Sequence, residues 1–560
     1  MINLDRLSAL IAEGESLQVE FKSDQRQISD AEIYEEVVAL ANTSGGTLLI
    51  GVEDNGVVTG AFARHGTTTD PIRLQAAIFN NTVPNVNTRI SLVEHPDGKV
   101  IAIEVDPYPE LCATAHGRCV RRTVGPDGKP QTIPFYPRDQ RSRRVDLGLM
   151  DFSAQVMEST SFDSLDPLEF ERLRQTILRL HGDRTLLELS NREIAQAMRL
   201  VETKSGRQVP NIAGLLLLGY ESVLREALPT HHVFFQVLDE RGNVKVNNAF
   251  RWPLLRVIDD LESRFAARNQ ESEVTVGLFR LPVPDYSAEG FREAVNNALL
   301  HRDYCRLDAA YIQWQPDHLL ITSPGGFPEG ITVNNILVHE PKPRNPRLAE
   351  AFKRIGLVEQ TGRGVDKIYM GQLRYGRPVP DYSRSDASGV RVVLYGGKPS
   401  LEFAKFVYEQ DKNGMPLSFD ELLILNSLFF ERRIDSESAG RLTQKGTSEA
   451  RNVLERLHER GLVEAAGEKT GRVYHLSASL YRELGQANGY VRTHGIDRLR
   501  QEGLVMEYIE AHGRITRAEM VKLLGVSPNQ ARRVIDRMRT SGKIKPKGNP
   551  PRWVYYVSAK

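Results

Sequence analysis

One stretch of the chain, residues 291–304 (FREAVNNALLHRDY), has two distinct helical faces and constrains the fold of the region around it. At about 100° per residue, a helix gathers its apolar side chains on one stripe, here Phe291, Val295, Ala298 and Leu299. Glu293, Asn297 and His301 recur at every fourth position and form a second, polar stripe. A carboxylate and an amide one turn apart could position water and a hard cation such as Mg²⁺, which prefers oxygen ligands. The alternative is an ordinary solvated helix face.

Two glycine-rich segments follow this stretch. Residues 323–330 (SPGGFPEG) come directly after a strand-like run, and residues 361–364 (TGRG) open a predicted helix over 365–370. Glycines at a helix start allow the backbone to approach phosphates closely. The candidate phosphate-binding positions are Gly325, Gly326, Gly362 and Gly364.

The order of polar helix, strand, glycine loop and glycine-opened helix resembles the GHKL-type ATPase fold of gyrase-like and histidine-kinase ATPases. It looks most like the divergent version in bacterial proteins labelled RecG-like or transcriptional regulators, over roughly residues 280–395. The specific part is the motif Arg-Glu-Ala-x-x-Asn-Ala-x-x-His-Arg-Asp-Tyr, residues 292–304. The resemblance implies ATP as cofactor, Glu293 as general base and Asn297 as Mg²⁺ ligand. Ser323-Pro324 replaces the family's adenine-binding aspartate, which predicts weak ATP binding or none.

The composition bounds the remaining possibilities. A chain of 560 residues predicts roughly three to five domains, and 40% hydrophobic residues suffice for several buried cores. Three cysteines without metal-ligand spacing predict reduced thiols. The N-terminal segment lacks a signal-peptide pattern, and no apolar run approaches the ~18 residues of a membrane span. These features predict a cytoplasmic protein with no membrane partner.

The first 145 residues are predicted to form one α/β unit. Residues 18–22 alternate in polarity like a half-buried strand, with Glu20 and Lys22 on one face. Ser29 is expected to cap a helix, and residues 47–52 are apolar on both faces, which predicts a central strand.

Four short features of this unit are Glu15, VEFK at 19–22, the residues around 41–46 and GVED at 51–54. Together they resemble the Schlafen-type divergent AlbA domain. The resemblance implies nucleic-acid binding. In animal Schlafens, two glutamates five apart and an aspartate after the central strand form a metal-dependent RNase site, and Glu15, Glu20 and Asp54 occupy those positions. Three carboxylates could hold Mg²⁺ or Mn²⁺ to activate water, and Lys22 could contact a phosphate. The alternative is structural, with Glu20 and Lys22 paired on a strand and Asp54 in a turn.

A basic segment ends this unit. Residues 118–144 contain eight Lys or Arg against two Asp, with Phe135 and Tyr136 between them. Such a segment suits a phosphate backbone, although a charge run is commonly just a solvated face. The candidate nucleic-acid contacts are Arg121, Arg122, Arg141, Arg143 and Arg144.

Residues 146–280 form a connecting α/β region. Asp166 and Ser190 are expected to cap two helices, and residues 254–265 to form a third. Residues 211–219 (NIAGLLLLG) predict a buried strand, and residues 234–238 another.

The C-terminal part contains an internal repeat. Residues 434–477 align without a gap with residues 515–558, pairing Ile434 with Ile515 and Tyr474 with Tyr555. Each copy predicts helix, short helix, turn, helix and a two-stranded wing, which looks like a winged-helix domain. Residues 514–560 hold twelve Lys or Arg and two acids, so the second copy predicts DNA binding. Its candidate contacts are Gln530, Arg532, Arg533 and Arg537. The first copy suits dimerisation equally well, and we expect a homo-oligomer.

The predicted architecture is α/β and α+β multidomain. It comprises an AlbA/Schlafen-like α/β domain (1–145), the connecting region (146–280), a divergent GHKL-like α/β sandwich (281–398) and two winged-helix domains (415–480 and 497–560). The main hypothesis is a nucleic-acid-binding regulator with a divergent ATP-binding domain, acting in transcription or defence, with DNA as the expected partner and RNA left open. The alternative is a Schlafen-like metal-dependent nuclease acting on foreign nucleic acid. An ATP-driven motor is disfavoured because no Walker-type Gly-x-x-x-x-Gly-Lys-Ser/Thr occurs.

Overall fold

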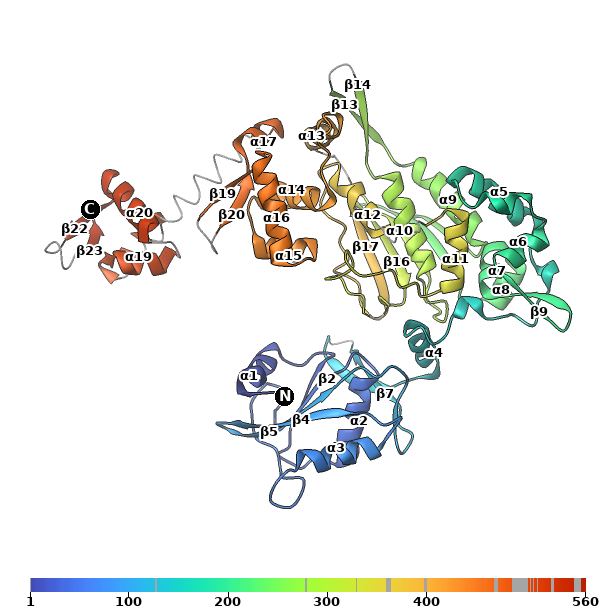
Figure 1. Cartoon of the computed structure of the whole chain (residues 1–560), viewed down its shortest axis with the longest axis horizontal. Coiled ribbons are helices and arrows are strands. Elements are labelled where there is room, and N and C mark those ends of the chain that lie inside the picture. Colours follow the sequence, from blue (N-terminus) through green and yellow to red (C-terminus); the bar gives the residue numbers. More distant parts are fainter. Residues whose placement is uncertain are drawn as a thin grey trace.

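The computed structural model (Figure 1) is a mixed α/β, multidomain structure. It describes residues 2–559 apart from 126–127, 277–278, 329, 359–363, 397–399, 468–471, 486–501, 504, 507, 511, 525–527 and 548–554. None of the helices in the described part combines the length and hydrophobicity that crossing a membrane requires.

The first domain is built on a four-stranded sheet with strand order β1-β2-β5-β4. Its strands are β1 Val19–Lys22, β2 Gly46–Ile50, β4 Thr88–His95 and β5 Gly98–Val105. β1 and β2 are parallel, because α2 (Asp30–Ala41) crosses between them with Ser29 as its cap, as predicted. The central strand β2 buries Leu48 and Ile50 on one face of the sheet and Leu49 on the other, which confirms that it is apolar on both sides.

Smaller elements complete this domain. They are α1 (Leu4–Glu13), α3 (Pro71–Asn80), β3 (Thr82–Val83), β6 (Ala113–Thr114), the hairpin β7–β8 (Val120–Val124 and Pro130–Pro134) and α4 (Pro137–Asp146). The basic segment predicted from the sequence therefore forms the hairpin and α4, at the end of the domain (Figure 1).

The connecting region is mainly helical. Its helices are α5 (Pro167–Leu180), α6 (Asn191–Ala197), α7 (Ile212–Leu218), α8 (Glu221–Ala227) and α9 (Leu254–Ala266), with the hairpin β9–β10 (Val201–Lys204 and Arg207–Pro210). Asp166 and Ser190 cap α5 and α6, as predicted. The predicted strand at residues 211–219 is wrong, because this segment is the helix α7. All seven residues of α7 are buried, so its unbroken apolar run reflects a helix enclosed on every side.

A five-stranded sheet with order β12-β11-β15-β16-β17 is the core of the next domain, which we call the central domain. Its strands are β11 Val233–Leu238, β12 Val244–Phe250, β15 Ala310–Trp314, β16 His318–Pro324 and β17 Gly389–Tyr395. β11 and β15 are parallel, and the other pairs are antiparallel. The helix α10 (Ala288–Leu300) packs on this sheet beside α9 and α12 (Gly364–Leu373), and α11 (Pro346–Ile355) follows β16. The sheet includes strands from both sides of residue 280, and the hairpin β13–β14 (Glu271–Val276 and Phe279–Pro284) lies between them in sequence.

The C-terminal part repeats one arrangement, preceded by α13 (Leu401–Lys412). The first copy contains α14 (Phe419–Glu431), β18 (Ile434–Asp435), α15 (Ser436–Thr443), α16 (Thr447–Glu459), β19 (Val463–Ala466) and β20 (Val473–Leu476), followed by α17 (Ala478–Glu483). The second contains β21 (Ile515–Thr516), α19 (Arg517–Leu524), α20 (Pro528–Thr540), β22 (Ile544–Lys547) and β23 (Tyr555–Ser558).

The strand pairing corrects the last part of the repeat alignment. Ile434 pairs with Tyr474, whereas Ile515 pairs with Tyr556. The structural counterpart of Tyr474 is therefore Tyr556 and not Tyr555, because the segment between the last two strands is one residue longer in the second copy.

Candidate functional site

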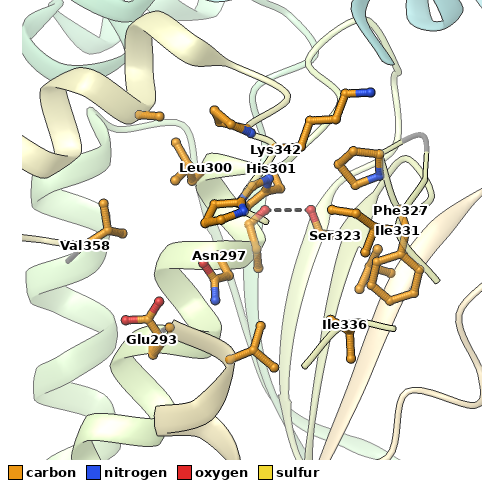
Figure 2. Close-up of a pocket in the computed structure, with 18 of the residues that line it drawn as sticks. Glu293, Asn297, Leu300, His301, Ser323, Phe327, Ile331, Ile336, Lys342 and Val358 are labelled. Carbon is orange, nitrogen blue, oxygen red and sulfur yellow. Dashed lines mark hydrogen bonds between the residues drawn. The ribbon is translucent and has the colours of Figure 1, made fainter. Parts of the chain in front are cut away.

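A cavity of about 510 Å³ lies in the central domain between the sheet and the helices α10, α11 and α12 (Figure 2). Part of its wall is a long connection between β16 and α11, residues 330–344, which we call the roof segment. Apolar side chains from every side line the cavity, among them Ala298, Ile321, Phe327, Ile336, Val365, Ile368 and Val392. Polar lining residues are Glu293, Asn297, His301, Ser323, His339, Glu340, Lys342, Glu350 and Lys353.

The polar stripe of α10 faces this cavity. Glu293 is buried and Asn297 half-buried, and Figure 2 shows both side chains projecting from neighbouring turns of the helix. A Cβ added to Gly364 would lie 2.0 Å from Glu293 Oε1, so any larger residue where α12 begins would require the Glu293 side chain to move. The prediction from sequence placed Gly364 near a phosphate, and the structure places it against the carboxylate of Glu293.

His301 continues the polar stripe into the cavity. Its ring Nδ1 is buried, and no described residue forms a hydrogen bond with it. Burial, with a smaller effect of the Arg344 charge, lowers the pKa of His301 to about 4, so the imidazole is neutral at neutral pH. The sequence placed His301 on the polar stripe without a role, and its unpaired nitrogen became apparent only in the structure.

The glycine loop after β16 contributes in two ways. Gly326 lines the cavity, whereas Gly325, with φ of +89°, forms the turn beside Arg344 and Asp303. Ser323, predicted from the sequence to replace an adenine-binding aspartate, donates a 2.6 Å hydrogen bond to the carbonyl oxygen of Ala298 (Figure 2). Gly362 lies outside the described residues.

The charged residues after α10 are structural. Arg302 is fully buried and donates hydrogen bonds to the carbonyl oxygens of His232 (2.6 Å), Asp308 (2.7 Å) and Thr230. Tyr304 is also buried, and its hydroxyl donates to the carbonyl oxygen of Leu299 at 3.0 Å. The Arg-Asp-Tyr part of the motif therefore fixes the end of α10 against β11 and β15.

The first domain holds Glu20 in a buried network of ion pairs. Glu20 Oε1 lies 2.8 Å from Lys22 Nζ, and Glu20 Oε2 accepts a hydrogen bond from the fully buried guanidinium of Arg122. Glu36 joins the network at 2.9 Å from Lys22 Nζ and accepts a 2.7 Å hydrogen bond from Thr132. Both cations predicted to contact phosphates here, Lys22 and Arg122, form ion pairs with buried carboxylates. For Arg122 the predicted phosphate contact is corrected, because its side chain has no exposed surface.

Glu15 and Asp54 lie near Glu20 but are held differently. Glu15 follows Gly14, which ends α1 with φ of 78°, and its Oε1 accepts a 3.1 Å hydrogen bond from the Phe21 amide. Burial raises the pKa of Glu15, the Phe21 amide opposes this, and the charges of Glu20 and Asp54 raise it further. The three carboxylates thus share one neighbourhood, with Asp54 exposed in its turn. Among the described residues, no three His, Cys, Asp or Glu side chains are grouped closely enough to hold a metal ion.

The remaining basic candidates differ in exposure. Arg121 is half-buried and forms an ion pair with Asp139 at 3.1 Å, and Arg143 is also half-buried. Arg141 and Arg144 on α4 are exposed, with the Arg141 guanidinium 5.6 Å from the centre of the Phe152 ring. These two side chains are the most accessible of the predicted contacts in this segment.

The candidate arginines on α20 of the second C-terminal copy differ in exposure and pairing. Arg532 and Arg533 are exposed. Arg537 is half-buried, with its Nε 3.0 Å from Glu502 Oε1, and Lys543 pairs with the same carboxylate at 2.6 Å. The structure does not describe the Gln530 side chain, so its predicted role is not tested.

Family models match three parts of the chain. The model described as "Schlafen, AlbA_2" matches residues 15–127, and the one described as "Putative ATP-dependent DNA helicase recG C-terminal" matches residues 310–394. Residues 142–234 match a domain of unknown function, DUF8451. The second match covers β15 to β17 with α11 and α12 and leaves out α10. Together the two named matches suggest a nucleic-acid-related function.

The similarity to a solved structure spans the chain. The crystal structure of the DIP2311 protein from Corynebacterium diphtheriae matches with a TM-score of 0.51 and 22% identity, covering 99% of each chain. At this identity the likeness concerns the fold alone. No curated protein matches the sequence. The chain therefore carries a Schlafen AlbA_2-type domain followed by a RecG C-terminal-type ATPase domain, the combination that its motifs predicted.

Proposed function

We propose that this protein is a nucleic-acid-binding regulator whose central cavity binds an adenine nucleotide. The observation that carries the proposal is the cavity beside α10. Its volume of about 510 Å³ falls within the range of small-molecule sites, and its lining is apolar with a few convergent polar groups.

The groups present fit a nucleotide. The buried Nδ1 of His301 lacks a partner among the described residues, and a hydroxyl or amine of a bound ligand would satisfy it. The apolar lining suits a flat base, and Lys342 and Lys353 supply positive charge for phosphates. Asn297 would hold Mg²⁺ through its amide oxygen, and Glu293 would accept a proton from an attacking water. When bound, Mg²⁺ would neutralise phosphate charge.

Adenine recognition is expected to be weak. The Ser323 hydroxyl donates to Ala298, which leaves its oxygen as a neutral acceptor where the family uses a carboxylate. A neutral acceptor forms a weaker hydrogen bond than an ionised one. We therefore propose a nucleotide-sensing role, with slow hydrolysis or none.

The proposed nucleic-acid contacts lie at both ends of the chain. Arg141 and Arg144 extend from the Schlafen AlbA_2-type domain, and Arg532 and Arg533 project from α20 of the second C-terminal copy. We propose that the two copies are winged-helix domains and that the second binds duplex DNA through α20. Positive side chains on a helix exposed in this way suit a phosphate backbone.

The metal-dependent nuclease is disfavoured as an alternative. Both oxygens of Glu20 are engaged by Lys22 and Arg122, so a divalent cation would have to displace a buried ion pair. The residues present therefore do not fit a catalytic metal, and we assign binding without cleavage to this domain.

The test uses the full chain with end-labelled duplex DNA and RNA, with Mg²⁺ or Mn²⁺ and with or without ATP. We expect a mobility shift that weakens with salt and leaves the label intact. Shortened labelled products that require the metal would establish the nuclease instead. The absence of any shift at about 100 μM protein, where even non-specific binders associate, would overturn the proposal.

A further inference from the structure

A single side chain, that of Arg344, joins the two ends of the loop that contains the roof segment. Arg344, its last residue, is buried and donates hydrogen bonds to the carbonyl oxygens of Gly326 (2.7 Å) and His301 (2.8 Å). Its Nε also donates to Asp146 Oδ1 of α4 at 2.7 Å. Gly326 lies four residues before the roof segment begins, and Arg344 ends it. The guanidinium of Arg344 therefore links the beginning and the end of this loop. Any change of shape must therefore occur between these ends.

The middle of the roof segment is held from outside the central domain. Gln444, at the end of α15 in the first C-terminal copy, accepts a hydrogen bond from the Leu337 amide at 2.8 Å. The same side chain donates to the carbonyl oxygen of Val333 at 2.7 Å. Ile331 and Ile336, close to these two positions in sequence, line the cavity. Only the roof segment would thus separate Gln444 from a ligand that contacts Ile331 or Ile336.

The backbone conformation at Gln444 is one that glycine adopts more easily than glutamine. Its φ of 56° is left-handed, a helix-ending conformation that glycine adopts most easily. The aligned position of the second copy is Gly525 in the sequence. The first copy instead carries a glutamine, and its amide makes both contacts to the roof segment.

The first C-terminal copy also rests on a second wall of the cavity. Phe419 of α14 packs edge-on against Tyr369 of α12, with ring centres 6.2 Å apart, and α12 supplies Val365 and Ile368 to the cavity. Asn426 of α14 donates a 2.9 Å hydrogen bond to the carbonyl oxygen of Arg377. Two walls, the roof segment and α12, therefore contact one and the same C-terminal copy.

We propose that Gln444 is a latch that couples occupancy of the cavity to the position of the first C-terminal copy. A ligand that displaces the roof segment changes the two Gln444 hydrogen bonds, and the α15–α16 turn responds. By linkage, a partner that moves this copy changes ligand affinity by the same factor. The identity of the ligand rests on the proposed function, whereas the latch itself rests on the contacts of Gln444.

The latch is tested first without any ligand, by amide hydrogen exchange on the full chain. In Gln444→Ala the Leu337 amide loses its acceptor, and its exchange should accelerate about tenfold, the effect of one hydrogen bond. The control is Arg441→Ala, because the Arg441 side chain bonds only to Glu437 and Ser438 of its own helix in the described structure. Unchanged Leu337 exchange in Gln444→Ala would overturn the proposal.

The coupling is tested by filling the cavity in two independent ways. One is millimolar Mg–ATP, and the other is a bulky side chain built into the lining, Ala349→Trp, with Ala294→Phe as a second variant should the first not fold. Filling should change the exchange of the Gln444 and Lys445 amides in the otherwise native chain, and this change should vanish with Gln444→Ala. Two results would refute the latch. In one, filling the cavity changes amide exchange in the roof segment but not at Gln444 and Lys445. In the other, the change in exchange at these positions persists in Gln444→Ala. If the tryptophan acts and Mg–ATP does not, the latch stands and the adenine nucleotide is the wrong ligand.

Discussion

Lys22 Nζ lies 2.8 Å from Glu20 Oε1, two residues along the same strand and on the same face of the sheet. Burial alone would lower the pKa of Lys22, but the charges of Glu36 and Glu20 together raise it. The lysine is therefore permanently charged and balances carboxylates that a metal-dependent nuclease would need for its cation.

Glu20→Gln is expected to destabilise the first domain by about 3 kcal/mol, because it removes the carboxylate nearest to the buried Arg122 and leaves Glu36, 3.9 Å away, as its ion-pair partner. The measurement is denaturant unfolding of the full chain, in which the transition assigned to this domain is compared between the native protein and the variant. The matched control is Asp54→Asn in the exposed turn, which should change stability by less than about 0.5 kcal/mol. A metal site would give a different pattern. Mn²⁺ would then raise the unfolding free energy of the native chain but not that of either variant.

Acid should destabilise the central domain through two histidines with lowered pKa values, the buried His231 and the half-buried His301. Burial, and then the charge of Arg344, lowers the pKa of His301 to about 4, and burial, and then Arg302, lowers that of His231 to about 3. In the unfolded chain both rings protonate near pH 6.5, so between pH 6.5 and 4 the unfolded state binds more protons. The penalty is absent above this window and grows as the pH falls, at about 1.4 kcal/mol per pH unit for each fully titrating histidine.

His301→Gln isolates this effect from the carboxyl groups that titrate in the same range. The difference in unfolding free energy between the native chain and the variant should change with pH between 6.5 and 4 and be constant above 7. A difference that is flat across the whole range would contradict the lowered pKa of His301.

Two arginines on α20 should behave differently in DNA binding. Arg533 is exposed, so Arg533→Ala should weaken duplex binding and reduce the slope of log affinity against log salt by about one. Arg537 pairs with Glu502, so Arg537→Ala should instead lower the stability of the second C-terminal copy. Mobility-shift titrations at several salt concentrations, with thermal unfolding of each variant, distinguish the two. An unchanged salt slope in Arg533→Ala would contradict the proposed DNA-binding face.

The elements that could be predicted were those encoded by local pattern. The polar stripe of α10, the strand β1, the apolar strand β2 and the helix caps at Asp166 and Ser190 all depend on residues close in sequence. The helix α7 was missed because an apolar run of seven residues has no period that separates a buried helix from a buried strand.

The contacts that could not be predicted join distant parts of the chain. The basic segment gave no sign that Arg122 points inward to Glu20, since an arginine run in sequence does not reveal which member is buried. Gln444 meets the roof segment from more than 100 residues away. Its one sequence signal is a glutamine where the aligned copy has Gly525, at the helix end where glycine is favoured.

The central claim, an adenine nucleotide beside Asn297, is tested most directly by calorimetric titration of Mg–ATP into the full chain and into Asn297→Ala and Asn297→Asp. We expect weak, saturable binding to the native chain, its loss in Asn297→Ala and its retention in Asn297→Asp, which keeps an oxygen ligand for Mg²⁺. Circular dichroism of the three proteins should be the same, because Asn297 is only half-buried. Binding of unchanged affinity in Asn297→Ala, or no binding to the native chain at millimolar Mg–ATP, would rule out an adenine-nucleotide site at Asn297.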